Sequence, residues 1–171
     1  IEAMLGGGSV GSLQWRERTL PDDARSILDV RNLDVDGSVH DVSFKVRAGE
    51  IVGLAGLMGS GRTEIAEAIF GVRAIGGGEI RVDDVPVRST AEAMSAGVAL
   101  VPEDRRRQGL VLDHTMQSNF ALPSLARFTK GLFVRDKAAG GEAVQAIRDL
   151  KIRTDGPGKV VQLLSGGNQQ K

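Results

Sequence analysis

The chain has 171 residues, with 22 basic and 22 acidic side chains and a formal net charge of zero at pH 7. This length allows one sizeable core, and zero net charge provides no general field that attracts nucleic acid or an anionic membrane. The absence of cysteine excludes disulfides and thiolate metal sites. No apolar run approaches the ~18 residues that a membrane span needs, and we expect no signal peptide. The composition is typical of a soluble intracellular α/β domain.

The first 25 residues predict a linker. A glycine-rich run over residues 6–11 and the polar stretch that follows it have the composition of a flexible connection, in which Trp15 is the only large apolar side chain. We therefore expect the ordered domain to begin near Ser26.

Alternation of apolar and polar residues predicts three strands in the next part of the chain. A period of two is typical of strands that bury one face. We therefore expect an antiparallel β layer. The alternating apolar positions are Leu28 and Val30, then Val42, Phe44 and Val46, then Ile80 and Val82.

Residues 50–70 predict an apolar strand, a glycine-rich turn and a helix. The spacing of Gly56, Gly61 and Thr63 fits a P-loop, in which backbone N–H groups hold phosphates and a Ser or Thr hydroxyl reaches Mg²⁺. The alternative is a strand-to-helix turn without a ligand. We predict a site for ATP and Mg²⁺, with Thr63 as the metal-contacting residue. The candidate binding residues are Gly56, Gly59, Ser60, Gly61, Arg62 and Thr63.

Arg62 departs from the P-loop pattern, which has Lys at this position. The planar guanidinium can bind phosphate oxygens, but it cannot act as the compact charge that Lys places between the β- and γ-phosphates. We therefore expect weak nucleotide binding and slow or absent hydrolysis.

The residues from Ser89 to Asp104 predict a short helix and a buried strand. Ser89 and Glu92 form a capping box for a helix that ends at Gly97, and an apolar run then begins at Val98. Because the run ends in Glu103 and Asp104, it imitates a Walker B strand, although Pro102 interrupts it.

Polar loops and helices are expected after Asp104. Residues 116–122 and 135–150 predict helices, the second with an apolar face that two glycines weaken by roughly 1 kcal/mol each. The basic run over residues 105–107 is interpreted as a solvated loop. A nucleic-acid patch is disfavoured because no aromatic side chains interleave with the run and the chain has no net positive charge.

The last eight residues, from Leu164 to Lys171, predict a helix start that faces phosphate. Ser165 is a good helix N-cap, and Gly166 and Gly167 let the backbone approach an anion closely. Taken alone, the same residues are also common in flexible loops.

The motifs at residues 56–64, 101–105 and 164–171 occur together, and with them the chain resembles the second, C-terminal ATP-binding domain of double-domain ABC import ATPases for ribose, galactose or xylose. The likeness covers nearly the whole chain, and residues 1–6 look like the end of a preceding domain. It implies an α/β fold, an ABC-type P-loop ATPase domain with a mixed core sheet, an antiparallel β layer and a helical subdomain, incomplete at the C-terminus. The implied boundaries are 1–25 for an interdomain linker, 26–103 for the P-loop core with the β layer, and 104–171 for the helical subdomain and signature.

The same resemblance implies how nucleotide is held. The order of the motifs favours a Q-loop over a Walker B strand, with Glu103 in the usual place of Gln and at the surface that receives the permease. Nucleotide lies between the P-loop of one domain and the signature of the other, so the signature serves the first domain's site and this chain holds no catalytic residue of its own. The signature residues implied to act in trans are Ser165, Gly166, Gly167 and Gln169.

Two further departures concern this chain's own half-site. It has no Tyr to stack on adenine, and the stretch where the family has that ring offers only His40, which we interpret as a surface or structural residue. The family continues after the signature with a Walker B strand, a catalytic carboxylate and a switch histidine, and His114 cannot replace the last because it precedes the signature. We expect the isolated chain to be inactive, and either to associate with itself or to be partly disordered near Ser165.

The expected function is therefore that of a transport ATPase in a full complex, peripheral to the cytoplasmic face of the cell membrane. The implied partners are the first ATP-binding domain of the same protein, a transmembrane permease and, indirectly, a periplasmic or lipid-anchored sugar-binding protein, with no nucleic acid. The alternatives are a regulatory nucleotide-binding module without turnover, the ATPase of a nucleoside or autoinducer importer, and a soluble protein that acts on nucleic acid or ribosomes. Near-zero charge argues against the last.

Overall fold

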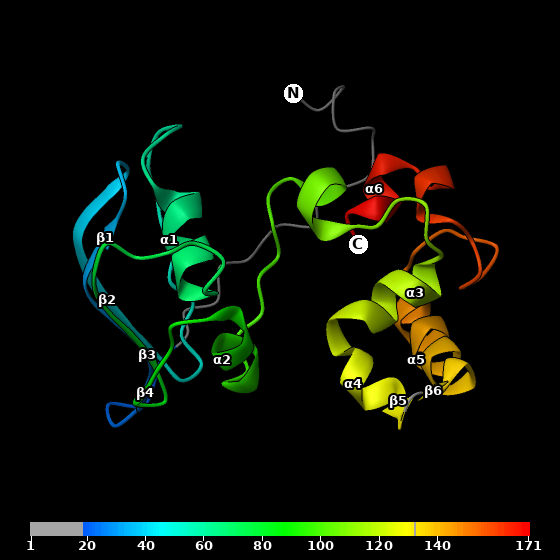
Figure 1. Cartoon of the computed structure of the whole chain (residues 1–171), viewed down its shortest axis with the longest axis horizontal. Coiled ribbons are helices and arrows are strands. Elements are labelled where there is room, and N and C mark those ends of the chain that lie inside the picture. The colour runs from blue at the N-terminus through cyan, green and yellow to red at the C-terminus, as the bar shows by residue number, and fades with distance from the viewer. Residues whose placement is uncertain (1–18, 132) are drawn as a thin grey trace. The chain divides into compact units, whose positions relative to one another are not determined.

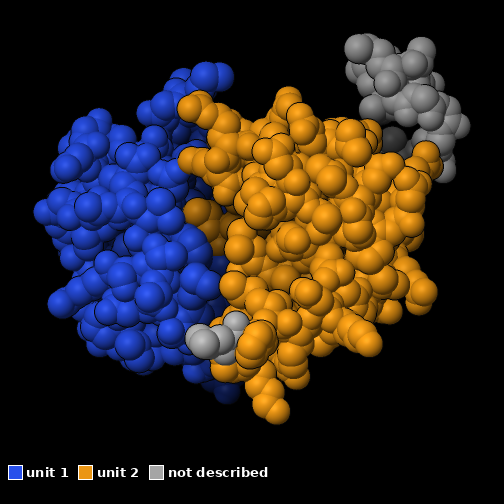
Figure 2. All heavy atoms as spheres, turned by 45° about the vertical axis from the view of Figure 1, so that its right-hand side comes forward, with its two compact units in different colours: residues 1–99 blue, residues 100–171 orange. Residues whose placement is uncertain are grey.

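The computed structural model describes residues 19–131 and 133–171. The described residues form two compact units, one that ends at Ala99 and one that runs from Leu100 to Lys171 (Figure 2). Most of the predicted linker, Trp15 and residues 1–6 lie outside the described residues.

A four-stranded antiparallel sheet forms the first unit, in the order β2-β1-β3-β4 (Figure 1). In the central strands, Val30 lies opposite Phe44 on one side and Ile80 on the other. This register confirms the antiparallel layer that the alternating residues predict. The strands are β1 (Ser26–Val35), β2 (Val39–Arg47), β3 (Gly77–Val82) and β4 (Val85–Pro86).

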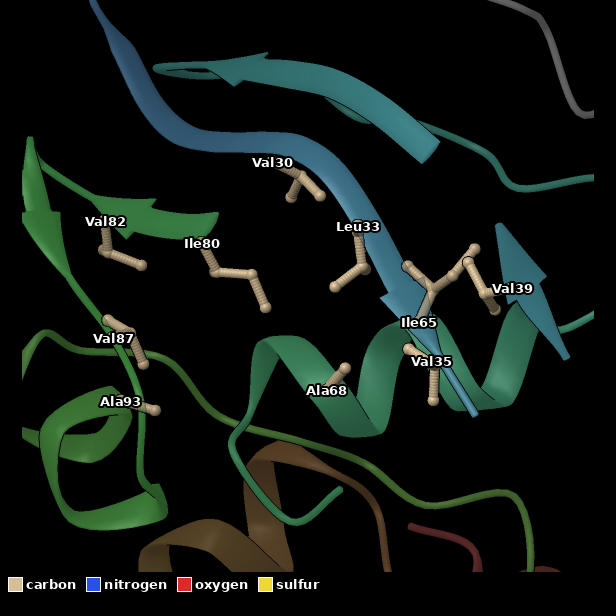
Figure 3. Close-up of a cluster of buried hydrophobic side chains, with 10 residues drawn as sticks. All are labelled: Val30, Leu33, Val35, Val39, Ile65, Ala68, Ile80, Val82, Val87 and Ala93. Carbon is tan, nitrogen blue, oxygen red and sulfur yellow. The ribbon is translucent and has the colours of Figure 1, made fainter. Parts of the chain in front are cut away.

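The core of the first unit lies between the sheet and two helices, α1 (Arg62–Ile69) and α2 (Thr90–Ser95). Figure 3 shows side chains of β1 and β3 gathered with those of both helices. Full burial of each Val, Leu or Ile contributes roughly 1.5–3 kcal/mol. The core therefore fixes α1, and the loop before it, to the sheet. Its members are Val30, Leu33, Val35, Val39, Ile65, Ala68, Ile80, Val82, Val87 and Ala93.

Helix α2 confirms the predicted capping signal. The Ser89 hydroxyl accepts a hydrogen bond from the Glu92 N–H at 3.3 Å, and the Glu92 carboxylate accepts one from the Arg88 N–H at 2.7 Å. The helix ends before Gly97, whose φ of 85° is typical of a left-handed C-terminal residue.

Two segments that the sequence predicts as buried strands are not strands. Residues 51–57 and 98–101 form no strand ladder within the described part of the chain, and Ile51 and Val101 are 78% and 93% exposed. A strand is stable only where a neighbour accepts and donates its backbone hydrogen bonds. No described strand pairs with either segment, so the strands that the structure describes in the first unit are those of the antiparallel sheet.

The second unit is mainly helical (Figure 1). Helices α3 and α5 confirm the two predicted from the sequence, and Ala139 and Ala143 of α5 are buried. Phe128 packs against Ala121 and Ala139 in a small core, with its ring centroid 6.4 Å from that of Phe120. The helices are α3 (Met116–Ala121), α4 (Leu125–Phe128), α5 (Asp136–Asp149) and α6 (Gly166–Gln169).

Short turns and two short strands complete this unit. The turns are the π-helical turn η2 (Arg105–Gly109) and the 3₁₀ turns η3 (Leu122–Ser124) and η4 (Val161–Leu163). The strands are β5 (Thr129–Lys130) and β6 (Phe133–Val134). Among the residues that the structure describes, no helix combines the length and the apolar character needed to cross a bilayer.

Candidate nucleotide-binding loops

The predicted P-loop is an exposed, tightly closed turn at the start of α1. The Ser60 N–H donates a hydrogen bond to the Leu57 carbonyl oxygen at 3.2 Å. Gly56 faces the Ser60 side chain so closely that an added β-carbon would collide with the hydroxyl oxygen. The loop therefore folds back on itself, as a cradle for a small anion requires.

Gly61 joins this loop to α1. It is the N-cap of the helix, with a φ of 87°, a left-handed conformation that residues with a side chain rarely adopt. A β-carbon on Gly61 would also lie 2.8 Å from the Ser38 carbonyl oxygen. The turn between β1 and β2 thus packs directly on the helix start, and only glycine fits there.

The first turn of α1 contains Arg62 and Thr63, both exposed. The first N–H groups of any helix have no intrahelical partner, and together with the helix dipole they favour a phosphate group. The structure thus brings the candidate residues from Gly56 to Thr63 into one loop.

This loop offers few protein ligands for Mg²⁺. Among the described residues, no group of three or more His, Cys, Asp or Glu side chains is placed to hold a metal ion. Thr63 would supply one protein oxygen, and Mg²⁺ commonly takes most of its remaining ligands from phosphate and water. The residues therefore fit a metal that arrives with a nucleotide.

The Glu103 loop begins the second unit. Glu103 is exposed, and Asp104 caps the turn η2, because its Oδ1 accepts hydrogen bonds from the N–H groups of Arg106 and Arg107, both at 3.1 Å. The side chains of Arg106 and Arg107 are exposed, in agreement with the interpretation of a solvated basic run, but Arg105 is half-buried and departs from it.

The signature forms a short helix start in the second unit. Ser165 is the residue before α6, as the sequence predicts, but within the described residues its hydroxyl caps no backbone N–H. It accepts a hydrogen bond from Asn168 Nδ2 at 3.1 Å instead. The side-chain amide one turn along the helix therefore takes the place of the expected backbone donor.

Asn168 and Gln169 anchor the signature to the backbone of its own unit. Asn168 Oδ1 accepts from the Arg153 N–H at 3.1 Å, and its Nδ2 also donates to the Arg153 carbonyl oxygen at 3.3 Å. Gln169 Nε2 donates to the Val161 carbonyl oxygen at 3.0 Å. The anchoring role of Asn168 could not be predicted from the sequence, because its backbone partners lie on a loop with no motif.

His40 is a surface residue. Its side chain is 79% exposed, and its Nδ1 lies 3.9 Å from Asp34 Oδ1. This placement confirms the interpretation of His40 as a surface residue.

A closed P-loop at a helix start that packs on an antiparallel sheet, in a chain that also has a helical unit, is typical of the class of α/β P-loop domains. The family described as ABC transporter matches residues 39–171, and the chain belongs to this family. The comparison with solved structures agrees: an ATP-binding cassette of an ABC transporter in its ADP conformation has a TM-score of 0.64 at 18% identity, over 85% of this chain and 61% of that one. At this identity the likeness shows the fold alone.

Two relatives of known name are much closer in sequence. The chain is 45% identical over 170 residues to a ribose import ATP-binding protein of Streptomyces avermitilis, across 98% of this chain and 32% of that protein. It is 43% identical over 147 residues to a putative ribose/galactose/methyl galactoside import ATP-binding protein of Rhizobium etli, across 85% and 28%. The chain spans about a third of the length of the curated relatives that it matches.

Proposed function

We propose that this chain is an ATP-binding domain of an ABC importer for simple sugars, and that in the full transporter it couples ATP binding and hydrolysis to transport. The observation that carries this proposal is the closed, exposed P-loop between Gly56 and Thr63 at the start of α1. Membership of the ABC transporter family supports the class. The names of the two sugar-import relatives support the cargo.

In the proposed site, the backbone does most of the binding. The N–H groups of the loop and of the first turn of α1 hold the phosphates, and the exposed Arg62 guanidinium adds a charge at their edge. Thr63 would be the protein ligand of Mg²⁺, and the ion would supply charge neutralisation at the phosphates. Because Arg62 spreads its charge over a plane, the site holds nucleotide weakly and turns it over slowly.

The signature is proposed to serve a second nucleotide site in trans. Ser165, Gly166 and Gly167 are exposed, while Asn168 and Gln169 tie the segment to its own unit. The partner would be the first ATP-binding domain of the same protein, with this chain as the second. A permease would contact the Glu103 loop, so the assembly would lie on the cytoplasmic face of the membrane, and a separate sugar-binding protein would deliver the cargo.

Calorimetric titration of this chain with ADP, and with a non-hydrolysable ATP analogue plus Mg²⁺, tests the P-loop. We expect weak binding to the wild type, about tenfold tighter binding to Arg62→Lys, because Lys restores the compact charge, and weaker Mg²⁺ dependence in Thr63→Ala. Arg106→Lys is the matched control and is expected to bind as the wild type does. Binding that is absent from both the wild type and Arg62→Lys would contradict the proposed site.

A regulatory module that holds nucleotide without turnover is the second candidate, and Arg62 favours it. ATPase measurements on the assembled transporter separate the two. If Arg62→Lys raises turnover while the P-loop of the other domain is disabled, the site takes part in hydrolysis; unchanged turnover with tighter binding assigns it a regulatory role.

A further inference from the structure

Arg105 connects two motifs that lie far apart in the chain. It follows Glu103 and Asp104 directly and starts the turn η2. Its Nη2 lies 3.1 Å from the point where a β-carbon on Gly166 would stand, so the guanidinium rests against the backbone of the signature. A β-carbon at position 166 would therefore press on the guanidinium.

The environment of Arg105 is unusual for an arginine. Its Nε is buried, and no described residue accepts a hydrogen bond from it. A buried N–H without a partner is unfavourable, so local hydrogen bonding does not explain why the side chain lies here. The feature of its position that bears on the signature is the contact with Gly166.

The turn that contains Arg105 is held by hydrogen bonds to Asp104 and by packing of Pro102 on Gly109. Asp104 accepts from the N–H groups of Arg106 and Arg107, and its carbonyl oxygen accepts from the Gln108 N–H at 2.9 Å. Pro102 packs on Gly109, where an added β-carbon would lie 3.1 Å from the proline Cγ. The segment from Pro102 to Gly109 is therefore expected to move as one piece.

The signature also has anchors within its own unit. Asn168 and Gln169 fix it to the backbone of Arg153 and Val161. A cavity of about 500 Å³ is lined by Glu103 and Arg105 from the turn and by residues 169–171 from the end of the signature, so the two segments lie side by side within the second unit.

We propose that Arg105 is a positioning residue that transmits a displacement of the Glu103 turn to Gly166 of the signature. The guanidinium is planar and stiff, and close-packed contacts pass on displacement rather than absorb it. A shift of the turn must therefore carry Gly166 with it or open a gap at Arg105. The functional meaning of this link rests on the proposed function, because Glu103 would face the permease and Gly166 a nucleotide.

Amide hydrogen exchange on the 171-residue chain tests the link directly. Gly109→Ala places a methyl group against Pro102 and next to the β-carbon of Arg105, which Arg105→Ala retains, and no signature atom is among the three nearest atoms, so the variant displaces the turn itself. We expect Gly109→Ala to change the exchange rates of residues 166–169 by about threefold or more, and we expect the change to disappear when Arg105→Ala is also present.

Arg106→Ala is the matched control, because Arg106 is an exposed arginine on the same turn. The effect of Gly109→Ala should persist in that background. Equal effects in the Arg105→Ala and Arg106→Ala backgrounds, or no effect of Gly109→Ala at all, would overturn the proposal. Thermal unfolding checks each variant, and Arg105→Lys, which keeps the charge but not the plane, repeats the test if Arg105→Ala does not fold.

A second readout uses the assembled transporter. Arg105→Ala is expected to lower the kcat of its ATPase about threefold or more at unchanged KM, whereas Arg106→Ala leaves both unchanged. Equal kcat values for the two variants would overturn the link. A wild type without ATPase activity would contradict the proposed function instead, and the exchange experiment would still decide whether Arg105 links the two segments.

Discussion

At the scale of single residues, Gly61 determines how the P-loop meets the rest of the first unit. Its left-handed backbone turns the chain into α1, and its missing side chain lets the β1–β2 turn pack against the helix start. These two requirements can be separated, because Gly59 in the same loop has a similar φ of 81° but no atom within 4 Å of an added β-carbon.

Gly61→Ala is therefore expected to destabilise the chain more than Gly59→Ala. Gly59→Ala introduces backbone strain alone, about 1 kcal/mol, whereas Gly61→Ala adds a collision with the Ser38 carbonyl oxygen and costs about 2 kcal/mol or more. Urea unfolding of both variants measures the difference in the free energy of unfolding. Equal losses in the two variants would show that the contact with Ser38 contributes nothing.

Residue types in a motif can be recognised from sequence, but the partner of each side chain cannot. Ser165 is predicted correctly as the residue before a helix, yet its hydroxyl binds Asn168 rather than a backbone N–H. The approach of Arg105 to Gly166 is equally invisible, because it depends on how the helical unit folds between them.

At the scale of elements, β1 combines an apolar face in the core with a charged face on the other side. Asp29 of β1 is almost fully buried, and its carboxylate accepts hydrogen bonds from Arg31 and forms an ion pair with Lys45 of β2 at 3.3 Å. The bond from Arg31 lowers the pKa of Asp29, burial opposes this effect, and Lys45 lowers the pKa further.

This shift predicts how stability depends on pH. A carboxyl group with a lowered pKa in the folded state stabilises the fold fully above its ordinary pKa of about 4, and the contribution is lost as pH falls through the folded value. In Asp29→Asn, the free energy of unfolding should therefore fall less steeply than in the wild type as the pH is lowered from about 5 to about 2. Denaturant unfolding across this range measures the slope.

Asp155→Asn provides the comparison. The pKa of Asp155 is also lowered, by a hydrogen bond from Lys159, but the Asp155 side chain is 85% exposed. High salt should remove the effect of Asp155→Asn, because exposed charges are screened, while the effect of Asp29→Asn should largely remain. Parallel pH profiles for Asp29→Asn and the wild type would refute the role of Asp29.

Sequence patterns predict a strand well where its pairing partners are recognisable in the same sequence. The alternation of apolar residues in β1, β2 and β3 indicates one buried face, and these three strands pair with one another. Residues 51–57 and 98–101 have no such pairing partner among the described residues. Their apolar character indicates burial but not which strand would pair with them, and no described strand does.

At the scale of the whole molecule, the two units differ in how well they are packed. The first has a continuous core between sheet and helices. The second buries fewer apolar side chains, namely Met116, Ala121, Phe128, Ala139, Ala143 and Val161. Because less apolar surface is removed from water there, we expect the second unit to be the less stable one.

Exposed apolar segments make self-association of the isolated chain the expected behaviour in solution. Ile51 and Val101 lie in segments outside helix and strand whose backbone groups pair with no strand of the described chain, and exposed apolar segments with unpaired backbone tend to pair with another copy. Sedimentation velocity should show a mean sedimentation coefficient that rises with protein concentration. The double variant Ile51→Lys with Val101→Lys should shift association to higher concentration by about tenfold, because a charge on an open edge opposes pairing.

Leu163→Lys is the matched control for this prediction. Leu163 is an exposed apolar residue in the turn η4, outside the segments that contain Ile51 and Val101, so its replacement should leave association unchanged if strand pairing is the cause. An equal effect of Leu163→Lys would assign association to general apolar exposure, and a wild type that stays monomeric at every concentration would show that the uncovered segments do not drive it.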